Sequence, residues 1–94
     1  MPRLNLNYDP FQQQWFSLEK NEQFAIVKTL KKLRQLTWQE VYQDKGLNWE
    51  LAREERGERF YSIRVTKKFR ALVQREGDFV IFIGLHPDHD SAYA

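Results

Sequence analysis

The sequence predicts an α+β domain in which N-terminal helices cover one face of a four- to five-stranded antiparallel sheet. Apolar residues recur with helical spacing in the first half of the chain and mostly with a period of two in the second half. One face of such a sheet must be buried, and only the helices can cover it. With 94 residues, the chain is expected to form a single domain over residues 1–94.

The first half of the chain is expected to hold a short strand and then three helices. Residues 4–8 alternate weakly, as a strand does, and Asp9 is placed to cap a helix whose first turn contains the proline that follows. The helical pattern covers residues 11–36, with a break in the segment EKNEQ. The segment Thr37–Glu40 has the spacing of a capping box, which predicts a brief third helix ending near Gly46.

The second half is expected to form a four-stranded antiparallel meander. In the first of its strands, alternation places Trp49, Leu51 and Arg53 on one face. The last strand is continuously apolar, which is typical of a central strand buried on both faces. Gly57 marks the first turn of the meander, and the segment EGD marks its last hairpin. The four segments are residues 48–54, 60–66, 69–75 and 79–85.

Composition excludes several classes of protein. The chain has no cysteine, so neither a disulfide framework nor a thiolate zinc site is possible. It has no apolar run of the ~18 residues that a membrane helix needs, and its N-terminal segment lacks the apolar core of a signal peptide. A cytoplasmic protein without membrane contact is therefore expected. The 3 tryptophans are expected to belong to the core or to its margin.

Positive charge is concentrated in one segment although the net charge is only +2. Residues 60–75 contain 5 Lys and Arg residues and no acid. Such a stripe can face a polyanion, or it can be the solvated face of a strand. Arg64 and Arg70 flank the turn formed by Lys67 and Lys68, so that a hairpin brings the two guanidinium groups together on one face. Paired guanidinium groups with adjacent lysines suit phosphate oxygens.

The C-terminal segment GLHPDHDSAYA carries groups that can move protons and stack on bases. His86 and His89 can act as acid or base near neutral pH, and Tyr93 can stack on a base or assist proton transfer. If this tail folds back beside the strand that carries Arg70, the groups suffice for metal-free RNA cleavage. In that reaction the 2′-hydroxyl attacks the adjacent phosphate, and arginines stabilise the added negative charge.

The same tail allows two other interpretations. The two histidines, with Asp88 and Asp90, include ligand types that zinc and nickel accept. Pro87 restricts the conformations of the loop, and no helix presents both imidazoles together. For these reasons no metal site and no cofactor are expected. The tail can also be an incidental polar terminus, with Tyr93 serving only to dock it.

Three segments together resemble the RelE/ParE superfamily of bacterial toxins from toxin–antitoxin systems. The order of features carries the resemblance: a strand with an Arg, a turn, a second Arg opening the next strand, an apolar strand, and a His before a near-terminal Tyr. The likeness covers roughly residues 20–94. The tail departs from the family pattern in having two aspartates and no Arg between its histidines and Tyr93. The three segments are LKKLRQLTWQEVYQDKGLNWEL, FYSIRVTKKFRALV and FVIFIGLHPDHDSAY.

The resemblance implies a ribosome-dependent messenger-RNA endonuclease whose active groove lies on the open side of the sheet. Carried over by position, Arg70 contacts the scissile phosphate. Arg64, with Lys67 or Lys68, holds the RNA backbone. These assignments are expectations that follow from the resemblance and from the placement of the cations in the sequence.

The resemblance also supplies roles for the groups that transfer protons. His86 or His89 is expected to act as acid or base, and Tyr93 to stack or to assist proton transfer. Glu50 occupies the place where some members keep a carboxylate base. The implied partners are a small acidic antitoxin, the ribosome and messenger RNA, whereas the oligomeric state stays open. Two alternatives remain: a toxin of this fold that inhibits DNA gyrase or another protein, and a non-toxic member that binds a small anion or metal.

Overall fold

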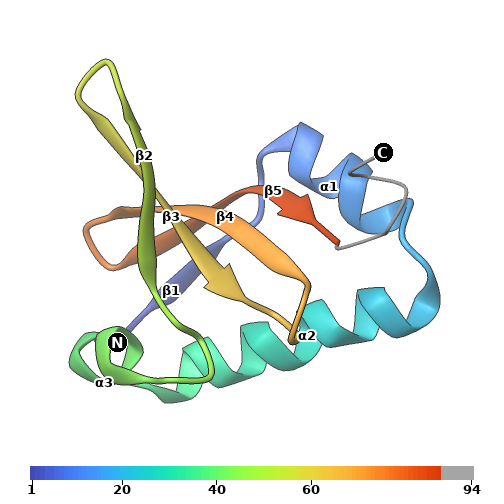
Figure 1. The fold of residues 1–94 in the computed structure, drawn as a ribbon, viewed down its shortest axis with the longest axis horizontal. Coiled ribbons are helices and arrows are strands. Elements are labelled where there is room, and N and C mark those ends of the chain that lie inside the picture. Colours follow the sequence, from blue (N-terminus) through green and yellow to red (C-terminus); the bar gives the residue numbers. More distant parts are fainter. Residues whose placement is uncertain (88–94) are drawn as a thin grey trace.

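The computed structural model describes residues 1–87, which contain three helices and five strands (Figure 1). The strands form one sheet in the order β1-β5-β4-β3-β2. Strands β2 to β5 are the expected antiparallel meander, while β1 pairs with β5 in parallel. The predicted α+β class is confirmed. The elements are β1 (Arg3–Asn5), α1 (Asp9–Phe16), α2 (Lys20–Gln35), α3 (Trp38–Gln43), β2 (Glu50–Glu55), β3 (Glu58–Arg64), β4 (Arg70–Glu76) and β5 (Phe79–His86).

Helix α1 starts one residue earlier than predicted. Tyr8 is the residue that precedes the helix, in extended conformation, and Asp9 is already helical, so the prediction that Asp9 caps α1 is wrong. The carboxylate of Asp9 instead accepts a hydrogen bond from Gln13 Nε2 at 2.6 Å, one turn further on. An acidic group in the first turn still interacts favourably with the helix dipole, so Asp9 supports the helix without capping it.

Capping boxes open both later helices. The box predicted at Thr37 is present: the Glu40 N–H donates to Thr37 Oγ1 at 3.1 Å, and the Thr37 N–H donates to Glu40 Oε1 at 2.9 Å. A second box, formed by Glu19 and Glu22, opens α2 after a break at residues 17–19. These two boxes fix where the chain turns between α1, α2 and α3.

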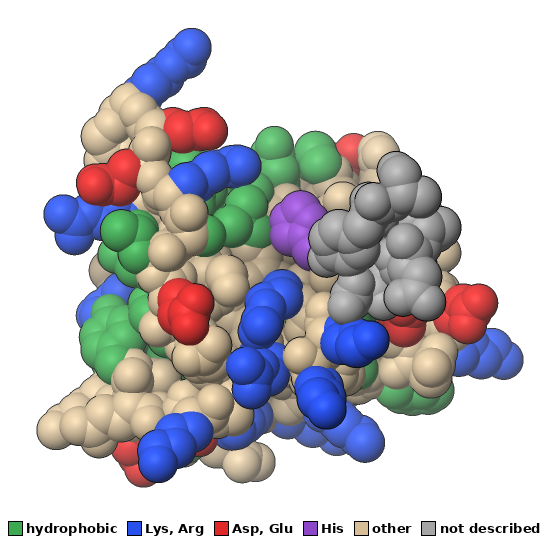
Figure 2. All heavy atoms as spheres, in the orientation of Figure 1, with side chains coloured by type: hydrophobic (Ala, Val, Ile, Leu, Met, Phe, Trp, Pro, Cys, Tyr) green, Lys and Arg blue, Asp and Glu red, His purple; other side chains and the backbone are tan. Residues whose placement is uncertain are grey.

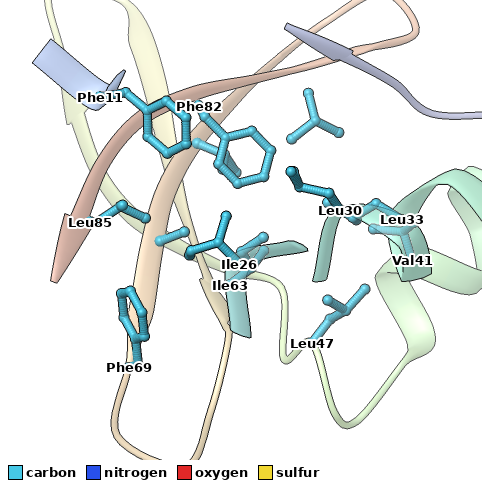
Figure 3. Close-up of a cluster of buried hydrophobic side chains, with 13 residues drawn as sticks. Phe11, Ile26, Leu30, Leu33, Val41, Leu47, Ile63, Phe69, Phe82 and Leu85 are labelled. Atoms are coloured by element: carbon cyan, nitrogen blue, oxygen red, sulfur yellow. The ribbon is translucent and has the colours of Figure 1, made fainter. Parts of the chain in front are cut away.

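The core lies between the helices and one face of the sheet (Figure 3). Phe11 of α1 meets Phe82 of β5 with ring centroids 5.2 Å apart, and both side chains are fully buried. Ile26 and Leu33 of α2 pack into the same cluster as Ile63 of β3. The helices therefore cover a single face, as expected, and the opposite face of the sheet is free to carry polar side chains.

A β-bulge in β2 overturns one prediction about the open face. Leu51 lies opposite Tyr61, but Arg53 lies opposite Phe60, because the register shifts between Leu51 and Arg53. Tyr61 and Phe60 are consecutive and point to opposite faces, so Arg53 does not share a face with Leu51 as the alternation had predicted. The guanidinium group of Arg53 lies over the Phe60 ring, 4.8 Å from its centroid.

The three tryptophans are partly buried and pack against the core, as predicted. Trp38 and Trp49 meet edge to face with centroids 5.8 Å apart. The guanidinium group of Arg75 lies 3.8 Å from the centroid of the Trp38 ring. Arg75 therefore belongs to this aromatic cluster and not to the open face, although it falls within the basic segment of the sequence.

Candidate nucleic-acid interface

Three predicted site residues form a row across the three inner strands of the sheet, at the end of β3, the start of β4 and the end of β5. Arg64 of β3 is the register partner of Arg70 of β4, which is in turn the partner of His86 of β5. Directly opposite residues in antiparallel strands point to the same face, with Cα atoms ~4.5–5.5 Å apart. Ile63, the neighbour of Arg64, is buried in the core, so the row lies on the open face. Arg64, Arg70 and His86 are called the basic row below.

The two arginines of the basic row have unused hydrogen-bond donors. Arg64 Nε and Arg70 Nη1 are buried atoms that have no hydrogen-bond partner among the described residues. None of the ion pairs found within residues 1–87 includes either arginine. A buried donor without a partner costs ~1–3 kcal/mol, and like charges directly opposite each other in a sheet are also unfavourable. An anion bound between the two guanidinium groups would remove both penalties.

The predicted lysines extend the positive charge along the β3–β4 turn. Lys67 and Lys68 are exposed. Between them and β4, Phe69 is buried, and its N–H donates to Thr66 Oγ1 at 3.3 Å. The turn is thus anchored by Phe69 while both lysines face solvent. Figure 2 shows Lys and Arg side chains gathered beside a histidine, over the end of β3 and the adjoining part of α2.

His86 is the exposed last residue of β5 and borders an open hollow of about 650 Å³. Tyr8, Gln13 and the displaced Arg53 also line this hollow. Gln14 fixes one wall, because its Oε1 accepts a hydrogen bond from the Leu85 N–H at 2.9 Å. The imidazole therefore stands at the rim of a space that is open to solvent and bordered by a further cation.

Glu50 lies on the same face but at the edge of the sheet. It is the register partner of Ser62, which lies two residues before Arg64 on β3, so Glu50 is diagonal to that arginine. Its carboxylate accepts a hydrogen bond from Asn48 Nδ2 at 2.8 Å. Two strands separate Glu50 from His86. The structure thus brings Glu50 near one end of the basic row and not between Arg70 and His86.

Two of the predicted site residues, His89 and Tyr93, lie outside the described residues, as do Asp88 and Asp90. Within residues 1–87, no group of three or more His, Cys, Asp or Glu side chains is arranged to hold a metal ion. Arg53 is a cation of this face that sequence reasoning missed. Its place depends on the bulge in β2, for which strict alternation gives no signal.

Comparison with known proteins gives one informative likeness. No protein-family model matches the sequence, and no curated protein matches it. The crystal structure of a copper-bound mutant toxin from Helicobacter pylori superposes with a TM-score of 0.54, over 97% of this chain and 98% of that chain, at 16% identity. This likeness shows that the two chains share an α+β fold. In the described part of the chain, no helix is long and apolar enough to span a membrane.

Proposed function

We propose that this chain is the toxin of a toxin–antitoxin system and that it cleaves messenger RNA on the ribosome, which stops translation. The observation that carries the proposal is the basic row, where two guanidinium groups with unused donors stand beside a histidine on the open face. The RelE/ParE resemblance of the sequence and the toxin-like fold both support this proposal. The chemistry needs only proton transfer and stabilisation of charge.

In the proposed reaction the ribose 2′-hydroxyl attacks the adjacent phosphorus and the bond to the 5′-oxygen breaks. A base removes the proton from the 2′-hydroxyl, and an acid donates a proton to the leaving 5′-oxygen, so the products are a 2′,3′-cyclic phosphate and a 5′-hydroxyl. Arg64 and Arg70 bind the phosphate oxygens and stabilise the negative charge that develops on them. His86 or His89 is proposed as the acid.

Two further roles complete the proposed site. Glu50, or the second histidine, is proposed as the base. Because Glu50 sits at the edge of the sheet, the RNA backbone would have to extend from His86 across β4 and β3 for this carboxylate to take part. Tyr93 is proposed to stack on a base next to the scissile bond. Lys67 and Lys68 are proposed to bind the RNA backbone next to the scissile bond.

Replacing Arg70 by alanine tests the function directly. We expect Arg70→Ala to lower cleavage ~10²–10³-fold, as the loss of a group that stabilises transition-state charge does. Inducing the wild type should arrest growth and create new messenger-RNA ends, and inducing Arg70→Ala should do neither. Arg59→Ala is the matched control, because Arg59 is an exposed arginine of the neighbouring strand β3 that is paired with Glu54.

The same experiment separates the alternative function. If growth arrest persists in both Arg70→Ala and Arg64→Ala, the basic row does not carry the activity. DNA breaks and induction of the SOS response without new RNA ends would indicate a toxin that inhibits DNA gyrase.

The proposal includes a protein partner. An acidic antitoxin segment that covers the basic row would neutralise it and block RNA. Co-purification of the chain with the product of a short neighbouring gene would support this partner. The complex should dissociate more readily as the salt concentration rises, because the pairing is electrostatic.

A further inference from the structure

The basic row ends next to a second hollow between α2 and the β3–β4 turn. This hollow measures about 330 Å³ and is called the α2 hollow. Four cations from three segments line it: Lys28 and Lys32 of α2, Arg64 of β3, and Lys67 of the turn. No acidic side chain is among the described residues that line it. Arg64 thus belongs to both the basic row and the α2 hollow.

Only one of the four cations is neutralised by the described part of the chain. Lys32 Nζ pairs with Asp44 Oδ2 at 2.7 Å, and the same oxygen accepts a hydrogen bond from the Leu47 N–H at 2.8 Å. The hydrogen bond from Lys32 lowers the pKa of Asp44 below its ordinary value. No ion pair within residues 1–87 involves Lys28, Arg64 or Lys67. The α2 hollow therefore holds an excess of positive charge.

The walls of the α2 hollow are held in place by backbone contacts. The Arg64 N–H donates to the Leu47 carbonyl at 2.7 Å, which ties the end of β3 to the loop after α3. Lys28 and Lys32 are one helical turn apart and so lie on the same side of α2. Gly46 leaves room for the Lys32 ammonium group, since a Cβ atom at that position would lie 2.8 Å from Lys32 Nζ.

We propose that the α2 hollow is a second phosphate site, which binds a neighbouring phosphate of the same single-stranded RNA that the basic row binds. Arg64 belongs to both the basic row and the α2 hollow, so one strand can contact both. This inference rests on the proposed function for the identity of the ligand. Its consequence is a preference for substrates with at least two phosphodiesters over a single phosphate.

Short oligonucleotides that resist cleavage test the two-site geometry. The probes are 2′-O-methyl uridine dimers and trimers, which carry one and two phosphodiesters and lack the attacking hydroxyl. For the wild-type protein we expect the trimer to bind at least ~10-fold tighter than the dimer, measured by calorimetry. The slope of log K against log salt should steepen by ~0.7 for the added phosphate.

Variants of the α2 hollow should remove the gain from the second phosphate. Lys28→Gln and Lys67→Gln should bring trimer affinity close to that of the dimer, whereas Lys31→Gln should not, because Lys31 is exposed on α2 but does not line the hollow. Gly46→Ala keeps every charge but displaces the Lys32 ammonium group, so it should weaken the trimer by a smaller factor. Thermal unfolding of each variant checks that it is folded.

Two results would overturn the second site. One is that the trimer binds more tightly than the dimer by the same factor in the wild type, in Lys28→Gln and in Lys67→Gln. The other is tighter binding of a glutamate-rich peptide than of the trimer, lost in the same variants, which would assign the hollow to an acidic protein. Failure of the proposed function has a different sign: messenger RNA would stay intact in cells that express the wild type.

Discussion

At the scale of single residues, the two arginines of the basic row are arranged in a way that does not favour the stability of the folded chain. Arg64 and Arg70 are directly opposite each other, and each has a buried nitrogen without a partner among the described residues. Neither feature stabilises the folded chain. Both are understandable if the two groups are arranged for an anion that is bound only during function.

Replacing Arg70 by methionine should therefore raise stability while it abolishes function. Methionine keeps much of the apolar stem of arginine and removes the charge. We expect Arg70→Met to increase the free energy of unfolding by ~0.5–1 kcal/mol in urea denaturation, because it relieves the like-charge pair and the unpartnered donor. Arg59→Met, which removes exposed interactions with Glu54 and Tyr61, should change it by less than ~0.5 kcal/mol. A loss of stability in Arg70→Met would contradict this view of the row.

The sequence predicts the basic row but not its surroundings. The meeting of Arg64 and Arg70 follows from counting outward from a tight turn, because alternation and hairpin geometry are local. The position of Arg53 cannot be predicted from alternation, because a bulge in the edge strand moves this residue to the other face. The sequence also does not predict that Lys28 and Lys32 line a hollow with Arg64, since this depends on how α2 lies against the β3–β4 turn.

At the scale of elements, the loop after α3 is fixed to α2 by the Lys32–Asp44 pair. Because the pKa of Asp44 is lowered in the folded chain, its carboxylate adds stability above the ordinary value of 3.8. That contribution is lost as the pH falls through the lower pKa of the folded state. The pair is partly exposed, so its contribution is limited by solvent screening.

Asp44→Ala should accordingly destabilise the chain in a manner that depends on pH. Near neutral pH we expect a loss of ~1 kcal/mol, since the substitution removes both the ion pair and the acceptor for the Leu47 N–H. The difference from the wild type should shrink once the pH is well below 3.8. Urea denaturation at pH 7 and pH 3 measures both values, and a difference that grows on acidification would contradict the assignment.

Local signals decided which element boundaries the sequence could predict. The Thr37 box fits the common Ser/Thr–x–x–Glu pattern and is predictable from the sequence. The box at Glu19 is not predictable in this way, because glutamate is not among the preferred caps. The start of α1 is predicted one residue late, because proline fits either of the first two helical positions. The parallel pairing of β1 with β5 joins distant parts of the chain and has no local signal.

At the scale of the whole molecule, the two faces of the sheet differ in the side chains they carry. Its helix-covered face is filled by apolar side chains such as Phe82 (Figure 3), while its open face carries the basic row. The α2 hollow lies past the end of β3, between α2 and the β3–β4 turn. This division explains why the fold class was predictable: the change from helical to alternating periodicity determines the layers. The exposed cations on one side give the molecule a face suited to a polyanion.

The most direct test of the central claim is the chemistry of the RNA ends that the protein produces on ribosomes programmed with a defined messenger RNA. We predict fragments ending in 2′,3′-cyclic phosphate and 5′-hydroxyl, because the 2′-hydroxyl is the attacking group, and we expect Arg70→Ala to yield none of them. Fragments with 3′-hydroxyl and 5′-phosphate ends would show attack by water. Those ends, or an intact messenger RNA with the wild-type protein, would contradict the claim.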